Sequence, residues 1–213
     1  MDLEILYKDD YIVAINKPNG LLVHKSSIAK NADTFALQLL RNQLGQRVYP
    51  LHRLDRKTSG ALLFGIDPEN LDHFSALFRR GEINKIYHAI VRGYINEEGT
   101  IDYAISNFKA KVQEAKTQYR CLGKYEIAVP SAGFQSSRYS LAELVPATGR
   151  MHQLRKHMAH IFHPIIGDRP YGCNKQNRMW KEKWEMTEML LHAKTIEFVH
   201  PVNGRAMSIE ASY

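Results

Sequence analysis

Residues 51–66 organise this chain, and they read LHRLDRKTSG followed by ALLFGI. The first part surrounds one carboxylate, Asp55, with four basic residues, which are His52, Arg53, Arg56 and Lys57. Nearby positive charges favour the ionised form of a carboxylate, which suits a base or a nucleophile better than a proton donor. The alternative is an exposed basic loop in which Asp55 only balances charge, because structural ion pairs also perturb ionisation.

The apolar run at 61–66 has the length and composition of a buried strand. Such a strand fixes one end of the loop that carries Asp55, and a fixed loop positions its side chains. Turn and cap signals on either side predict further elements. The expected strands are 3–7, 11–16, 21–24, 61–66, 85–91, 139–145, 190–199 and 206–211, and the expected helices are 33–45, 68–80, 150–160 and 174–188.

Residues 96–137 form the segment in which this patterning weakens. Five basic residues are interleaved with aromatic ones there, namely Lys109, Lys111, Lys116, Arg120 and Lys124. This composition indicates a solvated, irregular edge of a sheet. The alternative is a surface that binds the backbone of a nucleic acid and stacks on its bases.

A second informative stretch, residues 150–160, reads RMHQLRKHMAH. Its apolar residues recur at helical spacing, so we expect an amphipathic helix with Thr148 near the N-cap. His152 and Arg155 lie three residues apart and share a face of that helix. A guanidinium at the margin of a buried stripe needs a partner, because an unpaired buried charge costs several kcal/mol. Asp55 is the partner that we favour.

Four histidines in this region, His152, His157, His160 and His163, raise the question of a metal site. Their spacing lacks the i, i+4 pair of a helical zinc site, and no carboxylate or thiolate lies between them as a further ligand. We therefore expect solvated or RNA-facing histidines and no metal.

The composition bounds the class of protein. With 29 Lys and Arg against 22 Asp and Glu, the 213-residue chain has a formal charge of +7, which suits a polyanionic partner. The two cysteines, Cys121 and Cys173, are far apart, as expected of reduced thiols in the cytoplasm. Neither a signal peptide nor an apolar run long enough to span a membrane is recognisable.

Five short motifs stand in order along the chain. They are Asn16–Gly20 with Val23-His24, His52–Gly60, Lys85–Tyr87, Thr148–Arg155 and His163–Asp168. In sequence and order they resemble the motifs of RluA-type pseudouridine synthases, and the resemblance covers about Leu3 to Ile209. It implies an α/β catalytic domain of the α+β type, with a long mixed, mainly antiparallel sheet flanked by helices, a central cleft and no cofactor. Because the motifs begin almost at Met1, we expect one catalytic domain over 1–213 and no separate RNA-binding module.

The resemblance also assigns roles to residues. By it, Asp55 is the catalytic aspartate, Tyr87 stacks on the target uracil after the base is flipped out of the RNA, and Arg155 pairs with Asp55. Asp55 could attack C1′, remove the 2′ proton to give a glycal, or add to C6 of the ring, and each route needs an ionised carboxylate. The residues expected to bind substrate are His52, Arg53, Arg56, Thr58, Arg150, His152 and Gln153.

Three segments, residues 3–7, 87–93 and 176–178, resemble most closely a branch of the family that modifies position 65 in the T-arm stem of tRNA. We therefore expect a cytoplasmic, monomeric isomerase that acts on tRNA and does not associate with membranes. Two alternatives stay open, namely the same chemistry on ribosomal RNA and a non-catalytic RNA-binding protein with this fold. A metal-dependent nuclease is disfavoured, because the sequence lacks clustered carboxylates.

Overall fold

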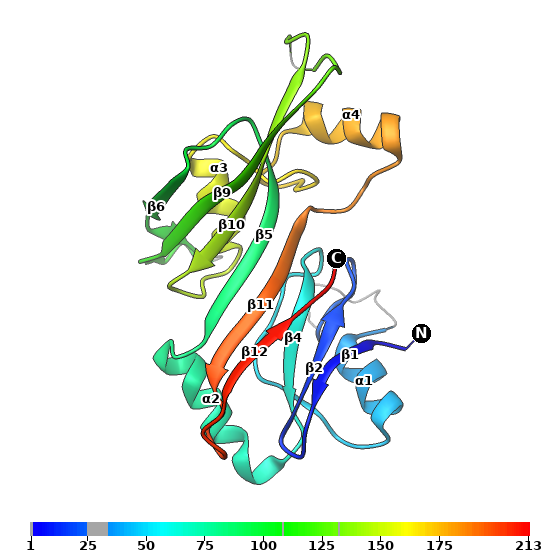
Figure 1. Cartoon of the computed structure of the whole chain (residues 1–213), viewed down its shortest axis with the longest axis vertical. Coiled ribbons are helices and arrows are strands. Elements are labelled where there is room, and N and C mark those ends of the chain that lie inside the picture. Colours follow the sequence, from blue (N-terminus) through cyan, green and yellow to red (C-terminus); the bar gives the residue numbers. More distant parts are fainter. Residues whose placement is uncertain (1, 25–33, 108, 132) are drawn as a thin grey trace. The chain divides into compact units, whose positions relative to one another are not determined.

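The computed structural model describes residues 2–24, 34–107, 109–131 and 133–213 (Figure 1). The chain divides into two compact units. The first unit contains Met1–Lys85 and His192–Tyr213, and the second contains Ile86–Leu191. In the described part of the chain, no helix combines the length and the apolar character that crossing a membrane requires.

The first unit is built on a sheet in the order β1-β2-β4-β11-β12, with the short β3 added to β4. The strands are β1 (Glu4–Lys8), β2 (Ile12–Lys17), β3 (Tyr49–Pro50), β4 (Ser59–Gly65), β11 (Leu191–Val199) and β12 (Ala206–Glu210). The pairing of β4 with β11 is parallel, and the other pairings in this unit are antiparallel. The apolar run that predicted β4 is its core, since Ala61, Leu62 and Phe64 are 0% exposed.

Two helices and a short 3-10 turn accompany this sheet: α1 (Ala36–Leu44), η1 (Pro68–Asn70) and α2 (Leu71–Arg80). Both α-helices end at glycines in the left-handed conformation, Gly45 and Gly81, which confirms the predicted ends. Phe74 and Leu77 of α2 pack into the core of the sheet. The helix therefore covers part of this unit's sheet.

Three predicted details in this unit had other outcomes. The strand expected at 21–24 is wrong, because only Leu22 forms an isolated bridge, with Phe35. The N-cap of α1 is Phe35, whereas residue 33, the expected first residue of this helix, lies outside the described residues. The helix expected at 68–80 is divided, because Asp67 caps η1 by accepting from Glu69 N and α2 begins only at Leu71.

The second unit contains an antiparallel sheet in the order β5-β10-β9-β6. The elements of this unit are β5 (Asn84–Arg92, from just before the boundary), β6 (Glu98–Asp102), β7 (Ile105–Ser106), β8 (Val112–Gln113), β9 (Lys116–Ile127), β10 (Ser137–Pro146), α3 (Gln153–His160) and α4 (Asn174–Trp184). The mixed α/β class and the mainly antiparallel sheet are therefore confirmed.

The irregular edge expected at 96–137 is wrong for most of that segment. It contains β9, a strand of 12 residues that pairs with β10 along its length, with one register shift. Thr117, Tyr119 and Cys121 alternate with exposed residues such as Gln118 and Arg120. None of these three inward-facing side chains is aliphatic, so the sequence gives little hydrophobic alternation.

Candidate active site

In the first unit, Asp55 lies in the turn that leads into β4, where Thr58 N donates to Asp55 O at 3.0 Å. Lys17, the last residue of β2, is 0% exposed and contacts this turn. Its ammonium donates to the carbonyls of Pro18, Leu21 and Arg56 at 2.9, 2.9 and 3.1 Å. One buried cation thus ties residues 17–21 to the loop of Asp55.

Burial lowers the pKa of Lys17 to about 8, against the opposing effect of the Asp55 carboxylate. The lysine is therefore still mainly protonated at neutral pH, and its positive charge interacts with the Asp55 carboxylate. The sequence identified Lys17 only as part of a motif, because its partners are main-chain carbonyls that no residue pattern reveals.

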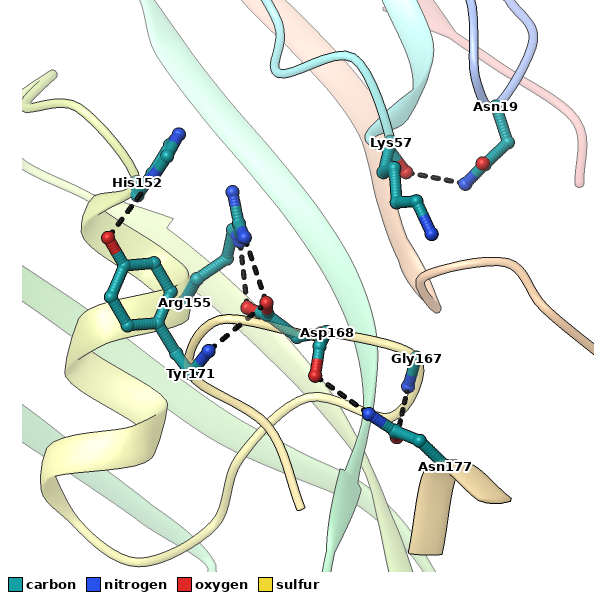
Figure 2. A network of polar contacts seen from close by, with 8 residues as sticks. All are labelled: Asn19, Lys57, His152, Arg155, Gly167, Asp168, Tyr171 and Asn177. Carbon is teal, nitrogen blue, oxygen red and sulfur yellow. Dashed lines mark hydrogen bonds and ion pairs between the residues drawn. The ribbon is translucent and has the colours of Figure 1, made fainter. Parts of the chain in front are cut away.

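The neighbouring residues of the same motif add further contacts to this loop. Gly20 N donates to Arg56 O, and Arg56 Nε donates to Gly20 O, both at 2.9 Å. The side-chain amide of Asn19 donates to Lys57 O, as Figure 2 shows. The backbone at 56–57 is therefore fixed from one side.

The start of β4 is fixed from β11. Ser59 Oγ lies 2.9 Å from His192 Nδ1. Gly60 has φ +105°, and a Cβ atom there would lie 2.3 Å from the carbonyl oxygen of Ala193. Only glycine fits where β4 and β11 approach each other this closely. The loop that begins at Asp55 is therefore held by residues 17–20 on one side and by β11 on the other.

The other predicted residues of this loop differ in exposure. His52 accepts a hydrogen bond from Leu63 N at 3.0 Å and stacks on Phe78, and burial together with Lys85 lowers the pKa of His52 to about 3. Thr58 is 3% exposed. Arg53 and Arg56 are exposed. Substrate binding by these four residues stays a prediction, with the two arginines the more accessible.

In the second unit, Arg155 forms a bidentate pair with Asp168. Arg155 Nε and Nη2 donate to the two carboxylate oxygens at 2.7 and 2.8 Å, and both residues are buried (8% and 1% exposed). The ring of Tyr171 lies 5.1 Å below the guanidinium carbon. This pair uses Nε and Nη2, and pairing of Arg155 with Asp55 of the first unit stays a prediction.

The loop that carries Asp168 is held by α4, as Figure 2 shows. The amide of Asn177 accepts from Gly167 N at 2.9 Å and donates to Asp168 O at 2.7 Å. Gly167 has φ +80°, and a Cβ atom there would lie 1.8 Å from Glu188 O. Asp168 and Asn177 hold Arg155 and its neighbouring loop in place, and the sequence analysis did not select either residue. Asp168 was nevertheless visible as part of the motif His163–Asp168.

The remaining predicted residues lie on β5 and around the start of α3. Tyr87 stands opposite Leu144 and is half-buried against the core of this unit. The side chain of Gln153 bonds to Thr148 Oγ1, Arg150 N, Lys116 O and Thr117 Oγ1. Arg150 is exposed and donates to Glu114 O.

The helix expected at 150–160 begins at Gln153, with His152 as its N-cap at φ +55° and with the His152 ring near the Tyr171 hydroxyl (3.1 Å). Thr148 does not cap the helix but bonds the Gln153 side chain. Roles in catalysis for Tyr87 and in substrate binding for Arg150, His152 and Gln153 stay predictions.

The expectation of solvated or RNA-facing histidines is wrong for His157. It is 0% exposed, with Nδ1 2.9 Å from Thr117 Oγ1 and Nε2 3.0 Å from Tyr103 O, and burial lowers its pKa. His163 Nδ1 lies 2.8 Å from Arg92 O. Among the described residues no group of three His, Cys, Asp or Glu side chains could hold a metal ion.

Comparison with known proteins gives the relationship of the chain. Two relatives called tRNA pseudouridine synthase C, from Vibrio vulnificus (strain CMCP6) and Haemophilus ducreyi (strain 35000HP / ATCC 700724), are each 45% identical to it. The matches cover 98% and 99% of this chain and 90% and 91% of the relatives.

Solved structures agree in fold. Human RNA Pseudouridylate Synthase Domain Containing 1 has a TM-score of 0.80 at 22% identity, covering 100% of this chain and 84% of its own. Human RNA Pseudouridylate Synthase Domain Containing 4 has a TM-score of 0.75 at 25% identity, covering 98% and 88%. Residues 11–160 match the family described as RNA pseudouridylate synthase. With this match and the near-full-length relatives, the chain belongs to the RNA pseudouridylate synthase family.

Proposed function

We propose that this protein converts uridine 65 in the T-arm stem of tRNA into pseudouridine, with Asp55 as the catalytic carboxylate. The single observation that carries the proposal is the 45% identity, over 98% of the chain, to a relative named tRNA pseudouridine synthase C. The position within tRNA rests on the motif resemblance. We further infer a cytoplasmic monomer, in keeping with the two free thiols Cys121 and Cys173.

The reaction exchanges one glycosidic bond for another. The bond from C1′ to N1 breaks, the freed uracil turns, and C5 bonds to C1′, while the proton of C5 is lost and N1 gains one. Asp55 opens this sequence as a nucleophile at C1′, as the base that removes the 2′ proton, or by addition to C6. All three routes use the Asp55 carboxylate, and the ammonium of Lys17 interacts electrostatically with it.

Tyr87 and Arg155 complete the proposed catalytic set. A uridine that leaves the RNA stack loses its base neighbours, and an aromatic ring such as that of Tyr87 offers a replacement. Arg155 is held by Asp168 in one orientation, which supports its use as a fixed cation for Asp55. The Tyr87 hydroxyl is the group we assign to the late proton transfer at C5.

The test is to incubate the full chain separately with unmodified tRNA and with unmodified ribosomal RNA, and to map pseudouridine by carbodiimide adducts and primer extension. We expect product at position 65 of tRNA from the wild type and none from Asp55→Asn, which keeps the size of the side chain and removes its charge. RNA affinity of the variant should stay close to that of the wild type, because phosphate contacts dominate affinity.

Other outcomes have distinct meanings. Product only in ribosomal RNA would keep the chemistry and discard the tRNA substrate. RNA binding without product in either RNA would favour a binding protein with this fold. Product from Asp55→Asn at the wild-type rate would remove Asp55 from the chemistry.

A further inference from the structure

Helix α4 has an outward face with a charge pattern that the proposed chemistry does not use. The inward side chains are Gln176 and Met179, which are 4% and 8% exposed. Lys175, Arg178 and Lys181 are exposed. At 100° per residue these three lie within one sector of about 120°, so they form one face, which Glu182 shares.

Charges of both signs lie around this face, since the exposed Glu185 and Glu188 follow α4. Glu182 is the acidic residue within α4, and Arg169 in the loop before the helix is a further exposed cation. The ion pairs that the structure gives for this unit involve other cations, namely His88, Lys116, Arg120, Lys124, Arg138 and Arg155. Among the described residues of this unit, the cations of the α4 face stand outside these ion pairs and can contact a polyanion.

An aromatic side chain stands beside these cations. Trp184 is 47% exposed and follows Lys181 by three residues, which places the two side by side on the helix. Its ring lies 4.8 Å from that of Trp180, which in turn donates to the Tyr139 hydroxyl at 3.0 Å. Cations with an adjacent aromatic ring are typical of surfaces that bind nucleic acids.

The same helix supports the loop of Asp168. Asn177 lies between the outward face and that loop, and it holds Gly167 N and Asp168 O (Figure 2). Asp168 in turn holds Arg155. An RNA backbone bound on α4 would therefore be placed by the element that also orients Arg155.

We propose that the α4 face, formed by Lys175, Arg178 and Lys181 and continued by Arg169, binds the phosphate backbone of the RNA substrate. This proposal depends on the proposed function for the identity of the RNA. Phosphate contacts by lysine and arginine release condensed counterions, so such a face contributes affinity that falls with added salt.

The chain offers an internal probe for this face, because both of its tryptophans, Trp180 and Trp184, lie in α4. The experiment titrates the full chain carrying Asp55→Asn with unmodified tRNA and follows tryptophan fluorescence, with filter retention as an independent measure of binding. We expect a saturable fluorescence change at the tRNA concentration at which retention saturates.

The variant adds Lys175→Gln, Arg178→Gln and Lys181→Gln to this background. We expect tRNA binding to weaken about 10-fold or more, and the slope of log affinity against log salt to fall in magnitude by about 2 to 3. The matched control adds Arg41→Gln, Arg79→Gln and Arg80→Gln, exposed arginines of α1 and α2 that remove the same charge. Its slope should stay close to that of the parent, and circular dichroism checks that both variants fold.

Equal losses in the α4 variant and the control would overturn the proposal, because only net charge would then matter. Retention of tRNA without any change in tryptophan fluorescence would overturn it as well. The readout is binding by an inactive chain, so it is separate from the proposed function. A wild type that modifies no tRNA, with an α4 variant that binds RNA more weakly than the control, would refute that function and keep this surface.

Discussion

At the scale of single residues, each unit contains a buried cation that is held by named partners, Lys17 in the first and Arg155 in the second. Lys17 is satisfied by three main-chain carbonyls, and Arg155 is satisfied by both oxygens of Asp168. A buried charge without such partners costs several kcal/mol, so each partner is as necessary as the cation itself. Main-chain carbonyls and one buried carboxylate thereby fix the groups around Asp55 and Arg155.

The pair of Arg155 with Asp168 gives a prediction for stability. Asp168→Asn keeps the shape of the side chain but removes the negative charge that accepts two hydrogen bonds from the buried guanidinium. We expect the free energy of unfolding to fall by about 3 kcal/mol or more, measured by urea unfolding at neutral pH.

The control for this prediction is Glu82→Gln, which removes the exposed pair of Arg80 with Glu82 (3.9 Å). Exposed pairs contribute little, so the unfolding midpoint should hardly move. A loss in Asp168→Asn no larger than in this control would mean that the buried pair does not hold Arg155.

At the scale of elements, local signals predicted most strands and helix ends. The apolar run of β4 and the glycines that end α1 and α2 were readable because each depends only on neighbouring residues. The long β9 was missed because its inward residues Thr117, Tyr119 and Cys121 include no aliphatic side chain.

The residues that hold the candidate segments in place, Lys17 and Asn177, were missed for another reason. Lys17 meets Arg56 O across 39 residues, and Asn177 meets the backbone of residues 167 and 168. Contacts with main-chain atoms leave no side-chain pattern, so only the fold reveals them. The motifs predicted which segments carry the candidate residues, and the structure adds what holds each segment within its own unit.

Helix α4 provides the prediction at this scale. Asn177→Ala removes the two contacts that hold the loop of Asp168, so Arg155 should lose its fixed orientation. We expect kcat on tRNA to fall about 10-fold or more with KM nearly unchanged, because small misplacements of positioned groups are costly in rate. Steady-state kinetics measure both constants.

The matched control is Asn174→Ala, at an exposed position of the same helix. It should leave both constants near their wild-type values. Asn177→Asp keeps the acceptor for Gly167 N and should lose less rate than alanine. A rise in KM with kcat intact would show that Asn177 serves RNA binding rather than the orientation of Arg155.

At the scale of the whole molecule, each unit contains a histidine that its surroundings keep neutral. Burial and Lys85 lower the pKa of His52 to about 3, and burial lowers the pKa of His157. In the unfolded chain both titrate near pH 6.5. The unfolded state therefore binds more protons below about pH 6.5, so stability falls as the pH drops through that value and recovers as it rises.

The prediction is an acid-sensitive fold. Between about pH 7 and about pH 5, each histidine should contribute a loss of at most about 1.4 kcal/mol per pH unit to the free energy of unfolding. His52→Gln keeps an acceptor for Leu63 N without a titrating ring, and it should reduce this slope. Urea unfolding of both proteins across the pH range measures the difference, and equal slopes would mean that His52 is protonated in the folded chain.

The three carbonyls around Lys17 can also be seen as an ion cage. Pro18, Leu21 and Arg56 turn their oxygens to one point, as carbonyl rings do when they replace the water around a potassium ion. The cation at that point is the Lys17 ammonium, which is covalently part of the chain and reaches its position when the chain folds. In the wild type the Lys17 ammonium occupies this point, so the turn at Asp55 needs no cation from solution. Lys17→Ala removes that ammonium, so the variant would have to bind a cation such as ammonium or methylammonium there.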